Sequence, residues 1–247
     1  MQKRIGVQLY SVRRELAKDF TGVIQAIAGM WYDGVELAGL PPGITPADAT
    51  ALFDSLRLTV ASGHFGLPIG ENASQVIDGA RALGCGMIVS SKGPDNFKTP
   101  DLVKRTCEEL NEAAANADKA GMRLAYHNHW WEFGNVEGHV VFDQMLDLLD
   151  PRVCFEVDTY WVKTGGGDPA KVVTVLGRRA PLLHIKDGPC VSGQPMVAVG
   201  KGAMEFAPIL AAGRHAEWLV VEIDECATDM LKAVQDSVRY LRGFSNE

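Results

Sequence analysis

Residues 101–128 read DLVKRTCEELNEAAANADKAGMRLAYHN, and this stretch combines the two patterns from which the fold can be inferred. Its first part, up to residue 121, has the periodicity of an amphipathic helix, with Lys and Glu on the polar face. The apolar face is formed by Leu102, Cys107, Leu110 and Ala114. Gly121 stands where a helix often ends in the left-handed conformation, and the apolar run 122–128 after it predicts a strand.

Similar apolar or β-branched runs occur along the whole chain. They are RIGVQLY (4–10), DGVELA (33–38), LTVASGH (58–64), CGMIVSS (85–91), MRLAYHN (122–128), RVCFEVD (152–158), PLLHIKD (181–187) and EWLVVEID (217–224). Segments with helical periodicity lie between most of them, and an amphipathic helix is expected over 228–244. Eight strand-then-helix repeats in a chain of 247 residues predict an α/β fold, a single (β/α)8 TIM-barrel domain over residues 1–247.

Local start and stop signals agree with this repeat. Thr45-Pro46 and Asp168-Pro169 each place a capping side chain before a proline in the first turn of a helix. Gly84, like Gly121, precedes the next predicted strand. The alternative fold, an open doubly wound sheet, needs no eighth strand and usually has a glycine-rich first turn, which QLYSVRREL is not.

Composition excludes several classes of partner. The chain is 47% hydrophobic and 22% charged with a net charge of -7, and it has no run of Lys and Arg. Nucleic acid and anionic membranes are therefore not expected to bind. The five cysteines are dispersed and lack a CxxC spacing, which argues against a disulfide framework. Without an apolar signal region or a stretch of eighteen apolar residues, we expect a soluble cytoplasmic protein.

Polar residues recur where the predicted strands end. The set comprises Gln8 and Tyr10, Glu36, His64, Lys92, His127 and His129, Glu156 and Asp158, His184 and Lys186, and Glu222 and Asp224. It holds four of the six histidines of the chain. Because active sites of TIM barrels are built at the C-terminal ends of the strands, these side chains are expected to converge there.

Two carboxylates and two imidazoles from neighbouring strand ends are typical of a divalent-metal site. Asp158, His184 and Glu222 are the expected core of this site, and the imidazoles suit Mn, Zn, Co or Fe better than Mg or Ca. Glu156 and Asp224 are interpreted instead as solvated loop carboxylates or partners of the ligands. Trp130, Trp131 and Trp161 are either hydrophobic packing or a wall on which a sugar ring stacks.

The ordered motifs resemble those of the sugar phosphate isomerase/epimerase group of xylose-isomerase-like barrels. They are GVQLYSVR, DGVELAG, YHNHWWEF, EVDTYWVKTGGGDP, LLHIKDG, GKGAMEF and VVEID, and the resemblance extends from residue 4 to about 240. The group includes tagatose/psicose 3-epimerases, inosose dehydratases and, more distantly, DNA repair enzymes of the endonuclease IV type. The resemblance implies one divalent metal, first of all manganese, with Co, Zn, Fe or Mg as alternatives, bound by Asp158, His184 and Glu222.

The chain departs from the epimerases at one ligand position. Where those enzymes have a glutamate after the fifth strand, this sequence has His127, within YHNH. This places it in the YHNH subgroup, near inosose dehydratases and enzymes that process 3-keto-glycosides. His127 is either the fourth metal ligand or a catalytic acid/base.

The expected reaction is removal of the proton alpha to the carbonyl of a keto-sugar, through a metal-stabilised enediolate. Glu222 would act on one face of the sugar, with His127 or Glu132 on the other. Lys186 is a candidate polariser, unless it forms a salt bridge with Asp187 or a nearby carboxylate. The residues expected to contact the sugar are Tyr10, Glu36, His64, His129 and Trp161.

Two alternatives stay open at this point. A lyase, such as a dehydratase or a β-eliminating enzyme, would use the same enediolate to expel a substituent. A non-catalytic sugar-binding barrel would bind a sugar without reaction. The sequence leaves open the substrate, its phosphorylation and the oligomeric state, a homo-oligomer included.

Overall fold

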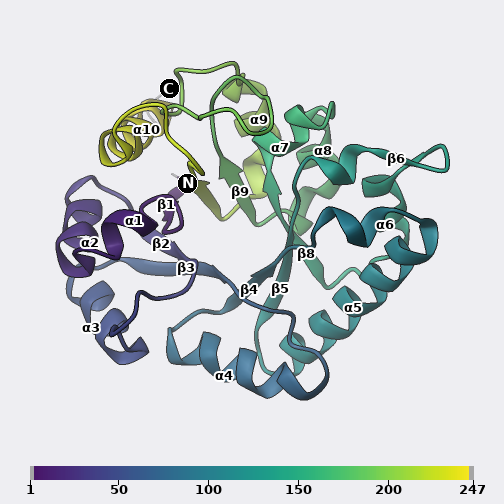
Figure 1. Cartoon of the computed structure of the whole chain (residues 1–247), viewed down its shortest axis with the longest axis horizontal. Coiled ribbons are helices and arrows are strands. Elements are labelled where there is room, and N and C mark those ends of the chain that lie inside the picture. Colours follow the sequence, from purple (N-terminus) through teal and green to yellow (C-terminus); the bar gives the residue numbers. More distant parts are fainter. Residues whose placement is uncertain (1–2, 245–247) are drawn as a thin grey trace.

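The computed structural model describes residues 3–244, and its centre is a closed barrel of eight parallel strands (Figure 1). The strands are β1 (Arg4–Gln8), β2 (Gly34–Leu37), β3 (Thr59–His64), β4 (Met87–Ser90), β5 (Arg123–His127), β8 (Val153–Asp158), β9 (Leu182–Ile185) and β10 (Trp218–Val221). Their order is β1-β10-β9-β8-β5-β4-β3-β2, with β1 paired to both β10 and β2. The predicted TIM barrel is confirmed, while the domain limits 1–247 stay a prediction, since residues 1–2 and 245–247 lie outside the described part.

Helices surround the barrel on all sides (Figure 1). They are α1 (Arg13–Leu16), α2 (Phe20–Gly29), α3 (Pro46–Ser55), α4 (Ala73–Ala82), α5 (Pro100–Lys119), α6 (Val141–Leu148), α7 (Thr159–Thr164), α8 (Pro169–Leu176), α9 (Phe206–Ala212) and α10 (Met230–Phe244). Short 3-10 turns are η1 (Gly70–Asn72), η2 (Pro94–Phe97), η3 (Trp131–Phe133), η4 (Gly177–Arg179) and η5 (Gly213–His215). Across residues 3–244, no helix has the length and apolarity needed to cross a membrane.

One element was not predicted from the sequence. The strands β6 (Asn135–Val136) and β7 (His139–Val140) form a small antiparallel hairpin between β5 and α6, at the outer edge of the molecule (Figure 1). Its two-residue strands are too short to show alternation.

The expected helix signals act as predicted. Thr45 and Asp48 form a capping box at the start of α3, and the Asp168 carboxylate accepts hydrogen bonds from the first turn of α8. Gly84 and Gly121 have φ values of +66° and +72°, the left-handed conformation that favours glycine at a helix end. The helix predicted over 101–121 is α5, whose buried face includes Cys107, while Leu102 at its start is only half-buried.

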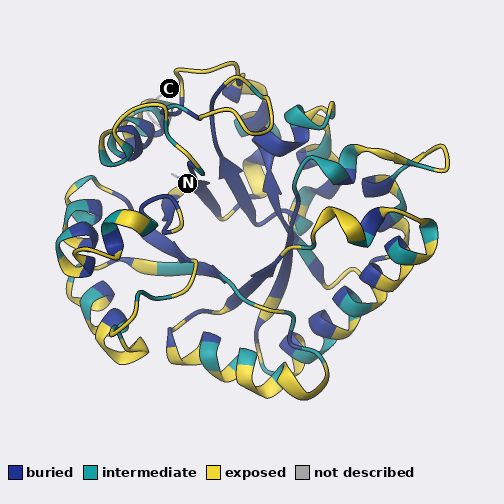
Figure 2. Ribbon diagram, in the orientation of Figure 1, coloured by how far each residue is buried: buried dark blue, intermediate teal, exposed yellow. Residues whose placement is uncertain are grey.

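The lower half of the barrel interior is apolar and closed. Met87, Val89, Ala125, Leu182, Trp218 and Val220 form a compact cluster there, separate from the larger core between barrel and helices. The Trp218 ring explains a glycine in β2: a Cβ on Gly34 would lie 2.8 Å from Cη2 of Trp218 and 2.2 Å from the Thr59 carbonyl oxygen. The strands are buried along the barrel, as Figure 2 shows. Among residues 3–244, the buried polar side chains of the barrel strands lie in the C-terminal halves of these strands.

Candidate functional site

Strand register brings the polar strand ends together. In the β5–β8 pair His127 lies opposite Glu156, and in the β8–β9 pair Asp158 lies opposite His184. Since alternate residues of a strand point to the same side, both carboxylates of β8 face the barrel interior. All four residues are buried. The convergence expected at the C-terminal ends is therefore present.

His127, Asp158, His184 and Glu222 form the upper cluster. Each offers one ligand atom, and these atoms all lie within 4.8 Å of one another. His127 Nε2 is 3.3 Å from Asp158 Oδ2, and His184 Nδ1 is 2.8 Å from Glu222 Oε2. The three ligands expected from the metal motif are thus brought together with His127 as the fourth.

His184 Nδ1 and Glu222 Oε2 are two buried ligand atoms of the upper cluster that face each other over 2.8 Å. The Lys186 ammonium group lies 2.7 Å from the same Glu222 oxygen, and Asp158 Oδ2 lies 4.0 Å from His184 Nδ1. A histidine nitrogen that faces carboxylate oxygens in a buried space has the kind of surroundings that a cation requires. The nitrogen and oxygen donors of the upper cluster fit a divalent metal ion.

Lys186 lies at the side of the upper cluster. Its Nζ is 2.7 Å from Glu222 Oε2 and 3.0 Å from Asp158 Oδ2. It also donates a hydrogen bond to Asp224 Oδ2 over 3.0 Å. Burial alone would lower the pKa of Lys186, but the charges of Asp158 and Glu222 raise it well above its usual value. Lys186 is therefore an ammonium group at neutral pH.

Two carboxylates near Lys186, Asp187 in the sequence and Asp224 in space, differ in role. Asp224 forms an ion pair with Lys186, in agreement with the salt-bridge alternative given for Lys186. Asp187 is not a partner of Lys186: its side chain accepts hydrogen bonds from the backbone N–H groups of Gly188, Gly200, Gly202 and Met204. Asp187 thus fixes the loop between β9 and α9.

His127 and His129 are both neutral at physiological pH. Burial lowers the pKa of His127 to about 4 and that of His129 to about 3. A neutral imidazole can ligate a metal or accept a proton, but it cannot protonate a leaving group. The His129 ring stacks on Trp131, with ring centroids 4.2 Å apart, and its Nδ1 is buried without a hydrogen bond among residues 3–244.

Asn128 and Glu132 hold the backbone around the two histidines. Asn128 accepts a hydrogen bond from the Asp158 N–H and donates one to the Asp158 carbonyl oxygen. Glu132 accepts hydrogen bonds from the Tyr126 hydroxyl and, over 2.9 Å, from the His129 N–H. Burial raises the pKa of Glu132 to about 7. Both carboxylate oxygens of this catalytic candidate are engaged, and the residue does not line the cavity described below.

A second group, the lower cluster, consists of Glu36, His64, Glu156 and His184. His184 Nε2 lies 2.7 Å from Glu36 Oε1 and 3.1 Å from Glu156 Oε2. His64 Nε2 lies 2.8 Å from the same oxygen of Glu156. Glu156 is 0% exposed, so of its two interpretations the solvated loop carboxylate is excluded. The other interpretation, a partner of the ligands, agrees with its contact to His184.

The carboxyls of the lower cluster differ in charge. Burial and the charge of Glu36 raise the pKa of Glu156. For Glu36 burial acts in the same direction, but the charge of His184 outweighs it and holds the pKa well below its ordinary value. Glu36 is therefore the ionised member of the pair.

A cavity of about 500 Å³ opens above the upper cluster. Its lining includes Tyr10, His64, His127, His129, Lys186 and Glu222. Glu36 and Trp161, also predicted to contact the sugar, do not line it. Glu36 lies in the lower cluster, and Trp161 packs against Trp130, with centroids 4.7 Å apart. The Trp161 ring is 7% exposed, which favours packing over sugar stacking.

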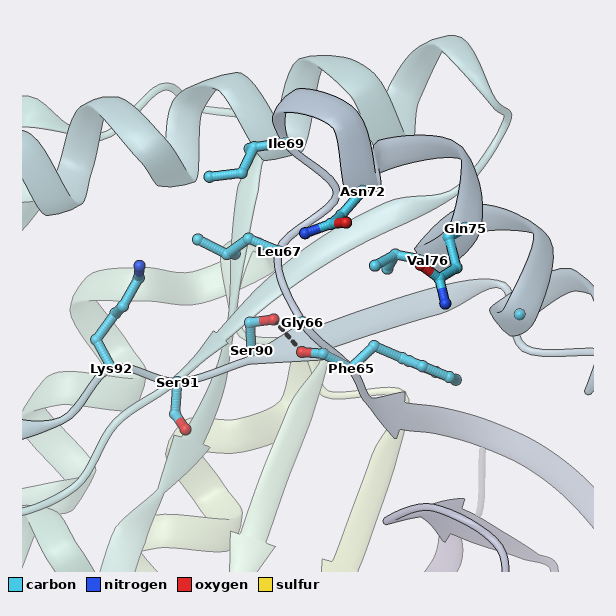
Figure 3. Close-up of a pocket in the computed structure, with 11 residues that line it drawn as sticks. Phe65, Gly66, Leu67, Ile69, Asn72, Gln75, Val76, Ser90, Ser91 and Lys92 are labelled. Atoms are coloured by element: carbon cyan, nitrogen blue, oxygen red, sulfur yellow. Dashed lines mark hydrogen bonds between the residues drawn. The ribbon is translucent and has the colours of Figure 1, made fainter.

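A neighbouring cavity of about 710 Å³ lies between β4 and the loop after β3 (Figure 3). Phe65, Leu67 and Val76 form part of its wall, and Ser91 lines both cavities. Lys92 borders this second cavity and pairs with Glu109. Lys92 is thus the member of the strand-end set that the structure separates from the two clusters.

Two buried residues of the site, Ser62 and Asn128, were not identified from the sequence, and Gln8 was placed in the strand-end set without a role. Gln8 and Ser62 both hydrogen-bond to Glu36. Ser62 and Asn128 had no signal in the sequence, because small polar side chains are common in strands and loops.

The chain was compared with known proteins. It matches the family described as xylose isomerase-like TIM barrel over residues 69–244. It is 25% identical over 159 residues to an inosose dehydratase from Lactiplantibacillus plantarum, a match that covers 55% of this chain and 52% of that protein. The chain thus spans about half the length of this curated relative.

Solved structures give matches over nearly the whole chain. A sugar phosphate isomerase/epimerase from Parabacteroides distasonis ATCC 8503 is 26% identical, with a TM-score of 0.83 over 97% of this chain and 93% of that one. A structure of L-ribulose 3-epimerase, 18% identical, has a TM-score of 0.71 over 98% of this chain and 94% of that one, and this likeness shows the fold alone. The resemblance inferred from the motifs is confirmed. The chain belongs to the xylose isomerase-like TIM barrel family.

Proposed function

We propose that this protein is a divalent-metal-dependent enzyme of the sugar isomerase/epimerase type that removes the proton alpha to the carbonyl of a keto-sugar. The observation that carries the proposal is the upper cluster, in which four ligand atoms converge beside the Lys186 ammonium group at one end of an open cavity. Its similarity to a sugar phosphate isomerase/epimerase supports the substrate class.

His127, Asp158, His184 and Glu222 would hold the metal, and manganese is the first candidate, with Co, Zn, Fe or Mg as alternatives. When bound, the cation supplies Lewis-acid stabilisation of the charge that develops on the substrate carbonyl oxygen. Lys186 can donate a hydrogen bond to the same region of the substrate, because its ammonium group lines the cavity.

Proton transfer is assigned to groups at the cavity wall. Glu222 is ionised, since the charges of Lys186 and His184 lower its pKa despite burial, so its carboxylate can accept the substrate proton. His127 is neutral and is the candidate on the other face of the sugar in the alternative in which Asp158, His184 and Glu222 alone hold the metal. Glu132, the alternative to His127, is less well placed because both of its oxygens are bonded. Tyr10, His64 and His129 are proposed to contact sugar hydroxyls.

A lyase is the second candidate function. The similarity to an inosose dehydratase favours it. Expulsion of a substituent beta to the carbonyl needs a proton donor, and within the described cavity lining the Lys186 ammonium group can serve, whereas neutral His127 cannot.

The test begins with metal content. The protein is freed of metal with a chelator and reconstituted separately with Mn, Co, Zn, Fe or Mg. Reconstituted protein is then incubated with a panel of keto-sugars and 3-keto-glycosides in deuterated water. Deuterium incorporation with an unchanged carbon skeleton supports an isomerase or epimerase, and loss of water or aglycone supports the lyase.

Matched variants complete the experiment. Glu222→Gln should abolish deuterium incorporation, whereas His139→Ala, in the outer hairpin, should leave it intact. Protein that binds no stoichiometric cation and gains nothing on reconstitution would contradict the proposal and favour a non-catalytic sugar-binding barrel.

A further inference from the structure

The His184 ring stands between the two clusters. Its Nδ1 faces the upper cluster, 2.8 Å from Glu222 Oε2. Its Nε2 faces the opposite way, 2.7 Å from Glu36 Oε1 and 3.1 Å from Glu156 Oε2. The three side chains His184, Glu36 and Glu156 are fully buried, so no solvent competes for these contacts.

This arrangement determines which nitrogen can serve a cation. A hydrogen bond from Nε2–H to a carboxylate leaves the lone pair on Nδ1, and a metal-bound histidine usually donates its other N–H to a carboxylate or carbonyl oxygen. Glu36 Oε1 is an acceptor at hydrogen-bond distance from Nε2, whereas Nδ1 faces Glu222, a member of the upper cluster. The ring is therefore oriented for ligation through Nδ1.

The two carboxylates are themselves held from several strands. Gln8 Nε2 of β1 donates to Glu36 Oε1 over 2.6 Å, and Ser62 Oγ of β3 donates to Glu36 Oε2. His64 of β3 holds Glu156 Oε2. A network that spans the barrel interior thus connects the walls on both sides of His184.

We propose that Glu36 and Glu156 are positioning residues: they bind the Nε2–H of His184 and thereby present its Nδ1 to the cation of the upper cluster. The inference rests on the metal dependence in the proposed function and identifies His184 as the ligand, and Nε2 as the atom, that Glu36 and Glu156 would hold. It also gives Glu36 a role below the cation in place of the predicted sugar contact. The lower cluster then needs no ion of its own.

The test measures metal affinity directly. Glu36→Gln keeps the shape but removes the charge, Glu156→Gln replaces one carboxyl oxygen by an NH₂ donor, and Glu36→Leu removes the acceptor as well. Affinity for Mn²⁺ and Zn²⁺ is determined by competition with a chelator, and we expect a loss of about 10–100-fold, larger for Leu than for Gln. Glu109→Gln is the control, because it changes a half-buried carboxylate that pairs with Lys92 outside both clusters, and its affinity should match the wild type.

A second readout reports the histidine itself. In Zn²⁺-loaded protein with ¹⁵N-labelled histidine, His184 should show a proton on Nε2 and none on Nδ1, and this proton should exchange faster with water in Glu36→Gln and Glu156→Gln. If Glu36→Leu does not fold, the Gln variants and the wild-type spectrum still decide the question.

Several results would overturn the inference. They are unchanged affinity and exchange in the Gln variants, a proton on Nδ1 in the loaded protein, or two bound cations per chain, which would make the lower cluster a metal site. The failures are distinguishable: wild-type protein without a bound cation refutes the proposed function too, whereas tight binding by wild type and variants alike refutes the positioning role alone.

Discussion

Replacing Glu132 with glutamine should stabilise the protein at alkaline pH and leave its stability at acidic pH nearly unchanged. The carboxyl is fully buried, with one oxygen facing the Tyr126 hydroxyl and the other the His129 N–H. A protonated carboxyl and a glutamine amide can both satisfy this pair, because the tyrosine oxygen can accept as well as donate. Only the ionised form of Glu132 is destabilised by burial, because a charged carboxylate loses its hydration.

The magnitude follows from the raised pKa of Glu132, about 7 against the ordinary 4.5. Below pH 4.5 both the folded and the unfolded chain are protonated. Between 4.5 and 7 the unfolded chain loses the proton while the folded chain keeps it, so stability falls as pH rises; above 7 the loss is complete. At about 1.4 kcal/mol per pH unit, the total is about 3 kcal/mol, of which roughly 2.5 kcal/mol falls between pH 5 and pH 8.

Urea unfolding of metal-free wild-type and Glu132→Gln protein at pH 5 and pH 8 measures this difference. The variant should be more stable than the wild type by about 3 kcal/mol at pH 8 and by less than about 1 kcal/mol at pH 5. Glu108→Gln, at an exposed position of α5, is the control and should follow the wild type at both pH values. Parallel pH dependence of Glu132→Gln and the wild type would refute the reasoning.

Three further substitutions test the fold, each by denaturant unfolding. Trp218→Ala should cost about 3–5 kcal/mol, because it empties the lower barrel interior, whereas Trp31→Ala, at a side chain 74% exposed, should change stability by less than about 0.5 kcal/mol. Thr45→Ala should cost about 1 kcal/mol by removing the capping box of α3, and an equal cost in Thr50→Ala, within the same helix, would contradict this explanation. Asp187→Asn should cost about 1–3 kcal/mol of stability and speed amide exchange over 188–204, since one amide oxygen cannot replace two carboxylate oxygens that accept four N–H groups. Asp143→Asn, at an exposed position, is the control. Equal amide protection of residues 188–204 in both variants would show that the loop does not depend on Asp187.

Most of the fold could be predicted from local sequence. Each strand and each long helix has its own periodicity, and helix ends such as Thr45 and Gly121 act through neighbours in the chain. The β6–β7 hairpin was missed because two-residue strands have no periodicity to detect.

The site could be predicted only in part. Asp158, His184 and Glu222 were found because they stand at strand ends and resemble a known motif, and the structure brings them together. The sequence could not decide between the two interpretations of Glu156, and Ser62 was missed, since burial and partners in other strands are not encoded in their own surroundings. Whether Glu132 and Trp161 take part in catalysis or binding stays a prediction, although neither lines the cavity.

The sequence by itself determined the order of strands and helices and the position of polar residues at the strand ends, because periods of two and 3.6 residues are local properties of the chain. Only the tertiary structure decided that His184 uses its two nitrogens on two different clusters, one towards Glu222 and one towards Glu36. Those contacts join residues of β2, β9 and the segment after β10, and their distances depend on the closure and register of the barrel. A shift of one residue in a single strand would turn its side chains from the interior to the helices.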